Sequence, residues 1–183
     1  MVKPKNLAIN FGLSIFSVIL ALVILEVILS FTKYKYAVIM DPHPPNLFKN
    51  NPEAGYDLQE NFSVHTFFLP SDFVEFKVWS NGLGCFDAPY RNDENFVLIV
   101  GDSQTFGILP HQHNWGQLLE NILERRFLTC GVGGYGTREA LTKAKKVISK
   151  TIHFPKLILL GYYLNDFDDD YRFPMRKVDN GYL

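Results

Sequence analysis

The chain has 183 residues, which is enough for one ordinary domain or for a small domain with an appendage. Its composition, 47% hydrophobic and 20% charged, is too apolar for a disordered chain and too poor in glycine and cysteine for a collagen or a disulfide-rich miniprotein. The formal net charge is -1, which excludes a broad basic surface, so we expect no nucleic-acid partner.

The amino-terminal segment is apolar over a length that spans a bilayer. Residues 7–25 carry no charge, and the apolar run resumes after Glu26. About 20 apolar residues cross the hydrocarbon core as a helix, whereas a cleavable signal has a shorter apolar run and a small-residue cleavage site. The segment therefore predicts one uncleaved transmembrane helix that contacts the lipid bilayer through residues 7–31, followed by the aromatic and basic residues Lys33, Tyr34, Lys35 and Tyr36.

Lysines lie on both sides of this predicted helix, so the positive-inside rule discriminates only weakly between its two orientations. Lys3 and Lys5 precede the helix, and Lys33 and Lys35 follow it. We favour an amino terminus in the cytoplasm, which places the rest of the chain outside the cytoplasm, in the periplasm or the extracellular space. Glu26 lies near one end of the apolar run, where a carboxylate reaches the interface, so we do not interpret it as a functional intramembrane acid.

Residues 36–95 form an entry segment between the anchor and the main domain. The segment contains turn signals such as Ser80-Asn81-Gly82, and residues 73–79 alternate apolar and polar side chains, which predicts a strand. Its Cys85 and the later Cys130 are compatible with one disulfide in an oxidising compartment and also with two buried free thiols.

The pattern from residue 96 onward predicts an α/β domain. Apolar runs at residues 96–100 and 157–160 are typical of strands buried on both faces of a parallel sheet, and we expect a short strand at residues 127–130 between them. Apolar residues at helical spacing lie between these runs, over 115–123 and after Thr137, which we expect to be an N-cap. We therefore divide the chain into an anchor (1–35), the entry segment (36–95) and the amino-terminal part of an α/β domain (96–183).

Three unusual loops follow the predicted strands, at the edge where open parallel sheets bind ligands. The first places Ser103 at a strand tip between Gly101 and Gly107, the second is the glycine-rich run 131–137, and the third brings the amide of Asn165. A serine hydroxyl with backbone N–H and amide donors nearby is the arrangement that acyl transfer needs, because the donors stabilise charge on the carbonyl oxygen.

These loops resemble the sequence blocks of the SGNH hydrolases, also called the GDSL esterase family. Gly101-Asp102-Ser103 is similar to the first block, Gly134 to the glycine of the second, and Asn165-Asp166 to the third. The resemblance covers about residues 80–170 and implies a flavodoxin-like, three-layer α/β/α fold. It also implies hydrolysis or transfer of O-acyl groups on an acylated small molecule or carbohydrate, without a cofactor. Ser103 would be the nucleophile, and the N–H of Ser103, Gly134 and Asn165 the oxyanion donors, with Asp102 and Asp166 shaping the site.

The catalytic base of the family has no counterpart in this sequence. The family takes its base from an Asp-x-x-His block, and no histidine follows Asn165 here. His153 precedes the third predicted strand and so lies at the wrong edge of the sheet. That leaves His111 and His113 after the nucleophile loop, and we expect both to be exposed loop residues. A parallel sheet also usually continues beyond three strands. Three explanations remain open: the sequence is a fragment, another chain supplies the missing strands and base, or the protein is a degenerate relative. The alternative to an enzyme is therefore a non-catalytic module of the same fold that binds a ligand or scaffolds a membrane assembly.

The sequence contains no metal-binding pattern. Asp166, Asp168, Asp169 and Asp170 form an acidic run, but its spacing does not match a calcium loop, and no zinc spacing of cysteine and histidine occurs. We expect a solvated loop at the acidic run and no bound metal.

Overall fold

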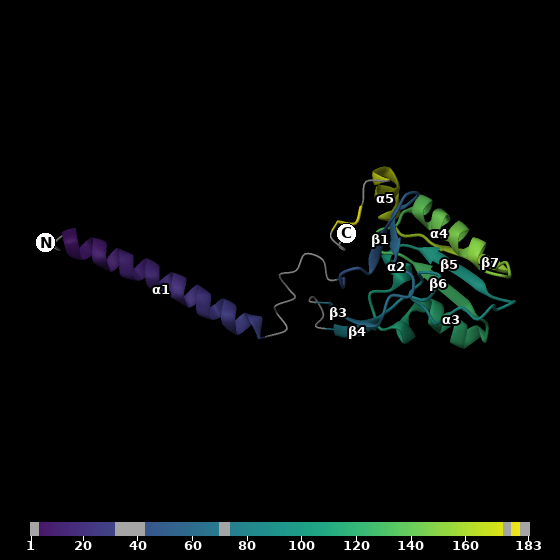
Figure 1. Cartoon of the computed structure of the whole chain (residues 1–183), viewed down its shortest axis with the longest axis horizontal. Coiled ribbons are helices and arrows are strands. Elements are labelled where there is room, and N and C mark those ends of the chain that lie inside the picture. The colour runs from purple at the N-terminus through teal and green to yellow at the C-terminus, as the bar shows by residue number, and fades with distance from the viewer. Residues whose placement is uncertain (1–3, 32–42, 70–73, 174–176, 180–183) are drawn as a thin grey trace. The chain divides into compact units, whose positions relative to one another are not determined.

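The computed structural model describes residues 4–31, 43–69, 74–173 and 177–179, and the chain forms two compact units, Met1–Met40 and Asp41–Leu183. The described part of the first unit is the helix α1 (Pro4–Ser30), and all other elements belong to the second unit (Figure 1).

Helix α1 confirms the helix predicted over the apolar run. Its stretch Asn10–Ser30 has 21 residues and a mean hydropathy of 2.7, so it is long and apolar enough to cross a membrane. The hydroxyls of Ser14 and Ser17 donate to backbone carbonyls one turn earlier, at 3.0 and 2.8 Å. These polar groups are thereby satisfied inside the helix, as a lipid environment requires. The expected flank of Lys33, Tyr34, Lys35 and Tyr36, like Lys3, lies outside the described residues.

Three parallel strands form the centre of the second unit. Strand β5 (Val97–Gly101) lies between β6 (Phe127–Gly131) and β7 (Leu157–Gly161). Every residue of β5 and β6 is buried, as apolar runs in a parallel sheet predict. The predicted mixed α/β class with a parallel sheet is therefore confirmed.

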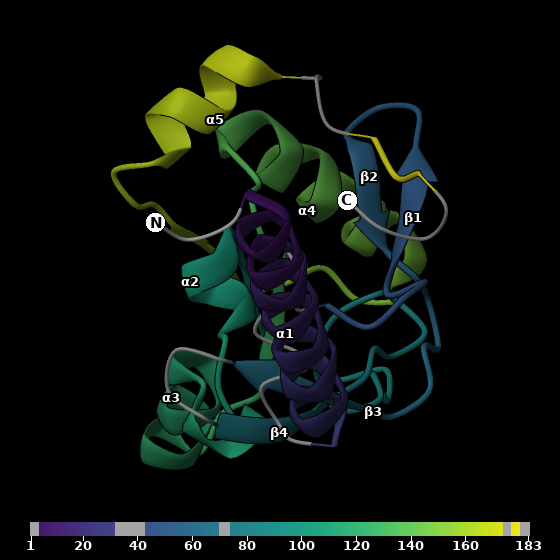
Figure 2. The same cartoon turned by 90° about the vertical axis from the view of Figure 1, so that its left-hand side faces the viewer.

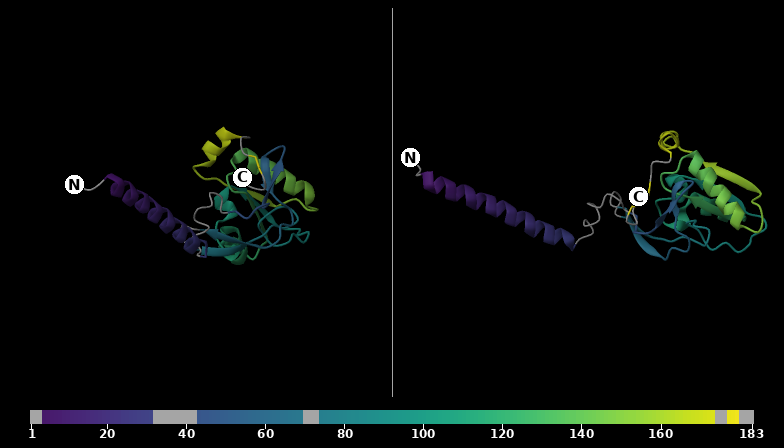
Figure 3. Two further views of the ribbon diagram at one scale, coloured as in Figure 1. Left: turned by 60° about the vertical axis from the view of Figure 1, so that its left-hand side comes forward. Right: turned by 45° about the horizontal axis from the view of Figure 1, so that its top comes forward.

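Helices cover both faces of this sheet (Figures 1 and 3). On one face, α3 (Trp115–Leu123) packs Trp115 and Leu119 against apolar side chains of β5 and β6. On the other face, α4 (Thr137–Lys150) packs Ala140, Ala144 and Val147 against the opposite side chains of the same strands. Successive side chains of β5 and β6 point to opposite faces of the sheet, so alternate residues pack against α3 and against α4.

Two helices differ in detail from the sequence prediction. In α3 the side chains of Leu118, Ile122 and Leu123 are exposed, so only part of its apolar stripe is buried. In α4 the N-cap is Gly136 rather than Thr137, because the Glu139 carboxylate accepts the Gly136 N–H at 3.1 Å and starts the helix one residue earlier.

The acidic run is a helix, so the expectation of a solvated loop was wrong. It forms α5 (Asp166–Arg172), in which Asp166 and Asp169 are buried. Asp170 accepts the Arg138 N–H at 3.1 Å, at the amino-terminal end of α4. Carboxylates are favourable near helix amino termini, where backbone N–H groups are unpaired. The acidic run therefore caps α4, beside which α5 lies (Figure 2).

The entry segment forms two antiparallel hairpins that pack on the main domain. One pairs β1 (Phe48–Asn51) with β2 (Gly55–Leu58), and the other pairs β3 (His65–Leu69) with β4 (Val74–Val78), which confirms the strand predicted near residues 73–79. Apolar side chains of both hairpins share one core with the second glycine loop and with the short helix α2 (Ser103–Phe106); they include Phe48, Tyr56, Phe67, Phe76, Phe106, Val132 and Tyr135.

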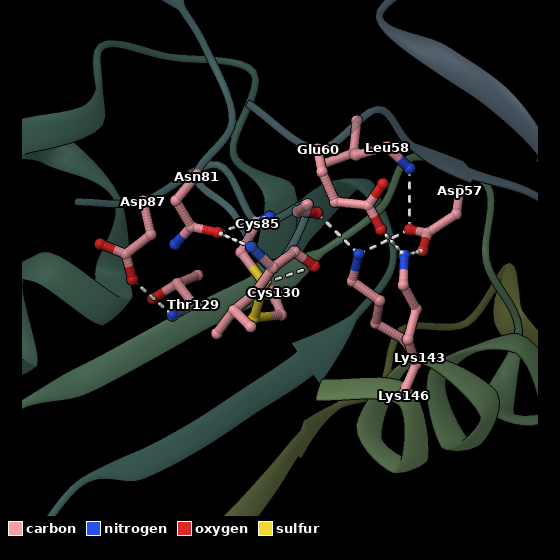
Figure 4. Close-up of a disulfide and its surroundings, with 12 residues drawn as sticks. Asp57, Leu58, Glu60, Asn81, Cys85, Asp87, Thr129, Cys130, Lys143 and Lys146 are labelled. Carbon is pink, nitrogen blue, oxygen red and sulfur yellow. Dashed lines mark hydrogen bonds and ion pairs between the residues drawn. A yellow bond between two sulfur atoms is a disulfide. The ribbon is translucent and has the colours of Figure 1, made fainter. Parts of the chain in front are cut away.

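A disulfide and a set of ion pairs fix the entry segment in place (Figure 4). Of the two states left open for the cysteines, the structure has the disulfide, which joins Cys85 to Cys130 in β6. The buried Asp57 carboxylate in β2 accepts from Lys143 and Lys146 of α4, each at 2.5 Å. Lys143 also donates to the Gly84 carbonyl at 2.6 Å. The hairpin β1–β2, the segment before β5 and α4 are therefore tied together.

Candidate functional site

Ser103 lies at the carboxyl end of β5, where the sequence places it. The Asp102 carboxylate is buried and caps α2 by accepting the Gln104 N–H at 2.8 Å. The Ser103 hydroxyl is partly exposed and lies 3.4 Å from the other Asp102 oxygen, to which it donates a long hydrogen bond. Asp102 therefore orients the start of α2 and the hydroxyl that projects from it.

Glycines at the ends of the three strands allow α2 to lie directly on the sheet edge. Gly101, Gly131 and Gly161 are opposite one another in the ladder. A Cβ at Gly101 or Gly161 would overlap the Thr105 hydroxyl, and one at Gly131 would overlap the backbone between Thr105 and Phe106. The absence of a Cβ at these three glycines thus lets α2 pack against the strand ends, and Ser103, the first residue of α2, lies close to them.

The second loop, after β6, contains a tight turn. The Tyr135 N–H donates to the Val132 carbonyl at 3.2 Å, and Gly134 has a φ of 72°. The hairpin β1–β2 is bonded to this turn, since the Tyr56 hydroxyl donates to the Gly133 carbonyl at 2.7 Å and the Tyr135 hydroxyl donates to the Tyr56 carbonyl at 2.6 Å. These contacts were not predicted. Tyr56 is separated from Gly133 by 77 positions and from Tyr135 by 79, and no local sequence pattern relates segments so far apart.

The third loop, after β7, brings Asn165 and Asp166 to the same edge of the sheet. One N–H of the Asn165 amide donates to Asp169 at 2.9 Å, which turns the amide toward α5. Because the amide nitrogen carries two hydrogens, this bond uses one of the two donors of the Asn165 amide.

Asp166 is a buried carboxyl group at this edge. It is 1% exposed, and one of its oxygens accepts the Tyr163 N–H at 3.1 Å. Its other oxygen has no hydrogen-bond partner within the part of the chain that the structure describes. Burial raises the pKa of Asp166 to about 6, and the neighbouring carboxylate of Asp102 adds to the rise. This carboxyl therefore titrates near pH 6, and it lies close to Asp102, the residue that precedes Ser103.

His111 is not the exposed loop residue that we expected. It belongs to the short 3-10 helix η2 (His111–His113), and its ring lies 4.9 Å from Trp79 and 5.3 Å from Phe86, measured between ring centroids. Its Nε2 atom is 3.4 Å from the buried Asp87 carboxylate, without hydrogen-bond geometry. These aromatic rings shield His111, whereas His113 is exposed as expected.

His43, from the entry segment, lies near the glycine loop. Its Nε2 atom is 4.0 Å from the position that a Cβ on Gly133 would take, and its ring packs against Phe48 and Phe67. No histidine hydrogen-bonds to the Ser103 hydroxyl in the described ranges. The same ranges contain no group of three His, Cys, Asp or Glu placed to hold a metal ion.

The strand ends thus bring together Ser103, the turn at Gly134 and the Asn165–Asp166 loop. This set places a hydroxyl group near backbone and amide N–H groups, which are the kinds of group that acyl transfer uses. No protein-family model, curated protein or solved structure matches the chain.

Proposed function

We propose that the protein is a membrane-anchored serine hydrolase or acyltransferase that acts on O-acyl esters, similar to the SGNH hydrolases. The observation that carries this proposal is the position of Ser103 just beyond the carboxyl end of β5. Strand β5 ends in register with β6, which leads to Gly134, and with β7, which leads to Asn165. Ligands of open parallel sheets bind at this edge. An acyl ester bound there would meet the Ser103 hydroxyl, with Ser103 N–H, Gly134 N–H and the Asn165 amide as oxyanion donors.

The strand order supports a flavodoxin-like fold for the domain. In chain order β5, β6 and β7 are the first, second and third strands, and their spatial order β6-β5-β7 is the 2-1-3 order with which a flavodoxin-like sheet begins. In that fold the ligand crevice lies between the first and third strands, which here carry Ser103 and Asn165.

The substrate class follows from the family resemblance and from the anchor: an acylated small molecule or carbohydrate outside the cytoplasm. The disulfide supports this location, because disulfides persist in oxidising compartments. The anchor would be the span 7–31, with its amino terminus in the cytoplasm.

Hydrolysis of p-nitrophenyl acetate by the full chain tests the proposal. Ser103→Ala should abolish the turnover above background, and Ser149→Ala, which removes an exposed hydroxyl on α4, should leave it unchanged. Because no histidine bonds to Ser103 in the described ranges, we expect turnover far below the roughly 1 to 1,000 per second of ordinary enzymes. Equal turnover by the parent chain and Ser103→Ala would refute the role of Ser103.

The second candidate is a non-catalytic module that binds an acylated ligand at the same edge. Among the described residues no histidine hydrogen-bonds to the Ser103 hydroxyl, and this favours the second candidate. Covalent labelling with a fluorophosphonate separates the two, since labelling requires an activated serine. If the protein is an enzyme, the parent chain should be labelled and the Ser103→Ala variant should not. If it is a binding module, the parent chain should stay unlabelled, and the Ser103→Ala variant should bind the ligand as well as the parent chain does.

A further inference from the structure

Strand β7 is an open edge of the sheet that is apolar on both faces. Within the described part of the chain it pairs with β5 alone, so its outer side faces no second strand. Leu157 points to one face of the sheet and Ile158 and Leu160 point to the other, and all three side chains are about half exposed. An edge strand of this kind is a template on which a further strand can pair.

The charges on the two flanks of β7 differ in sign. Lys156 and the ionisable His153 lie just before the strand, and the acidic run 166–170 follows it, with Arg172 as its nearest compensating charge. If a second copy of the chain adds its β7 antiparallel to the first, the basic flank of each copy lies beside the acidic flank of the other. Parallel pairing would place like charges together, which is unfavourable. The strand is therefore complementary to an inverted copy of itself, as the interface of a twofold dimer must be.

Full overlap of two antiparallel β7 strands determines which residues come together. When Leu157 faces Gly161 of the partner subunit, Leu159 faces its own counterpart across the twofold axis. In this register position 153 of one copy is level with position 165 of the other. His153 thus lies at the wrong edge of its own sheet but at the right edge of the partner's sheet, the edge that carries Asn165 and Ser103.

A histidine at this place supplies the kind of group that a serine nucleophile needs. Within one copy, no histidine hydrogen-bonds to the Ser103 hydroxyl among the described residues. Neighbouring strands lie about 4.8 Å apart, so β5 would lie about 10 Å from the partner's β7, a separation that serine and histidine side chains pointing toward each other can bridge. We infer that the chain forms a twofold dimer through β7, in which the partner subunit's His153 is the general base of the Ser103 site. The inference rests on the proposed function.

The proton and the bonds balance in such a site. As the Ser103 oxygen bonds to the acyl carbon, its proton passes to the unprotonated nitrogen of the His153 ring. The ring then returns this proton to the oxygen of the leaving alcohol as the ester C–O bond breaks. Water or an acceptor hydroxyl releases the acyl group from Ser103 by the same transfers in reverse. A single copy lacks the base and turns over slowly, so turnover per chain should rise with chain concentration as dimers form.

Cysteine crosslinking tests the pairing independently of any activity. The two native cysteines are joined to each other, so Leu159→Cys introduces the one free thiol of the chain. Opposed residues of an antiparallel pair have Cβ atoms about 4.5 to 5.5 Å apart, which is close enough for a disulfide after a small adjustment. Mild oxidation of the full chain in detergent should therefore give a covalent dimer. Ile122→Cys, at an exposed apolar position of α3, should stay monomeric.

A second pair of variants covers the case that Leu159→Cys disturbs the fold. Ile158 and Leu160 are exposed and face each other across the axis in the same register. A mixture of Ile158→Cys and Leu160→Cys chains should therefore crosslink as well. Monomers from all of these β7 variants, or equal crosslinking of Ile122→Cys, would overturn the pairing.

Complementation between two defective variants tests the role of His153. His153→Ala should lower the Ser103-dependent kcat for p-nitrophenyl acetate by about 10²-fold or more, whereas His113→Ala, at an exposed histidine, should leave it unchanged. In an equimolar mixture of His153→Ala and Ser103→Ala chains, about half of the dimers contain one of each, and each such dimer has one complete site. Turnover of the mixture should therefore return to about one quarter of the parent value.

The outcomes separate the dimer, the base and the proposed function. Full turnover by His153→Ala, or a mixture that stays as inactive as its components, would overturn the role of the partner subunit's His153. Absence of Ser103-dependent turnover in the parent chain would contradict the proposed function and this role with it. The crosslinks would still decide whether β7 pairs with a second β7.

Discussion

At the scale of single residues, Asp166 makes the stability of the fold depend on pH. The pKa of its carboxyl is raised by burial from an ordinary 3.8 to about 6. Between these two values the folded chain holds a proton that the unfolded chain has already released. The free energy of unfolding should therefore fall as the pH rises through this window, by roughly 3 kcal/mol for a shift of about two pKa units.

Asp166→Asn should remove this dependence, because the amide oxygen can still accept the Tyr163 N–H but carries no ionisable proton. We expect the variant to be more stable than the parent chain at pH 7.5 and closer to it at pH 4. Asp168→Asn, at an exposed position of the same helix, is the control. Urea unfolding at both pH values measures the difference, and parallel pH profiles of Asp166→Asn and the parent chain would contradict the role of Asp166.

At the scale of secondary-structure elements, the ion pairs between β2 and α4 hold the entry hairpin on the domain. Lys143 is fully buried and burial lowers its pKa to about 8, although Asp57 pairs with it. Lys143→Met would leave the Asp57 carboxylate with Lys146 and the Leu58 N–H, and the Gly84 carbonyl without the Lys143 donor. Breaking a buried pair costs about 3 to 5 kcal/mol, so we expect a loss near the lower limit.

Lys150→Met is the matched control, because Lys150 lies on the same helix and pairs with Glu60 at the surface. An exposed pair contributes about 1 kcal/mol or less. Denaturant unfolding of both variants gives the two losses, and equal losses would mean that the buried pair contributes no more than the surface pair.

Strand β7 has an edge that its neighbours do not protect. Among the described residues it pairs with β5 alone, and Leu157, Ile158 and Leu160 are 51%, 46% and 45% exposed. Exposed apolar edge strands favour association with other chains. Ile158→Lys should therefore reduce concentration-dependent self-association in detergent, measured by light scattering, with the unfolding free energy nearly unchanged. Undiminished association would show that another surface is responsible.

The sequence was a good guide to elements whose pattern is local, and a poor guide to contacts between distant segments. The apolar run of β5 predicted a buried parallel strand, the alternation of strands and helices predicted β6, and Gly101 and Ser103 predicted the strand-tip turn. The prediction that residues 157–160 are buried on both faces was wrong, because Leu157, Ile158 and Leu160 of β7 are exposed. The run is as apolar as that of β5, but burial depends on what lies beside the strand. Tyr56 and His43 were missed for a related reason, since both reach the glycine loop by tertiary folding alone.

At the scale of the whole molecule, the disulfide makes the stability of the fold depend on the redox state of the compartment in which the chain folds. Cys85 and Cys130 are fully buried, so they do not meet external oxidants once the domain has folded. The bond closes a loop of 45 residues, which should stabilise the folded chain by roughly 4 kcal/mol through the lost freedom of the unfolded chain. A domain that folds in a reducing cytoplasm would lack this contribution.

Thiol alkylation therefore tests the proposed orientation of the anchor. The chain is expressed with its helix α1, denatured in the presence of a large maleimide and examined for a change in gel mobility. If the domain lies outside the cytoplasm, neither cysteine should react until a reductant is added, after which two labels should attach. Cys85→Ser is the control, since it should give one label without reductant and should lower the free energy of unfolding. Two labels without reductant would mean that the thiols stay reduced in the cell, and would contradict the extracytoplasmic location.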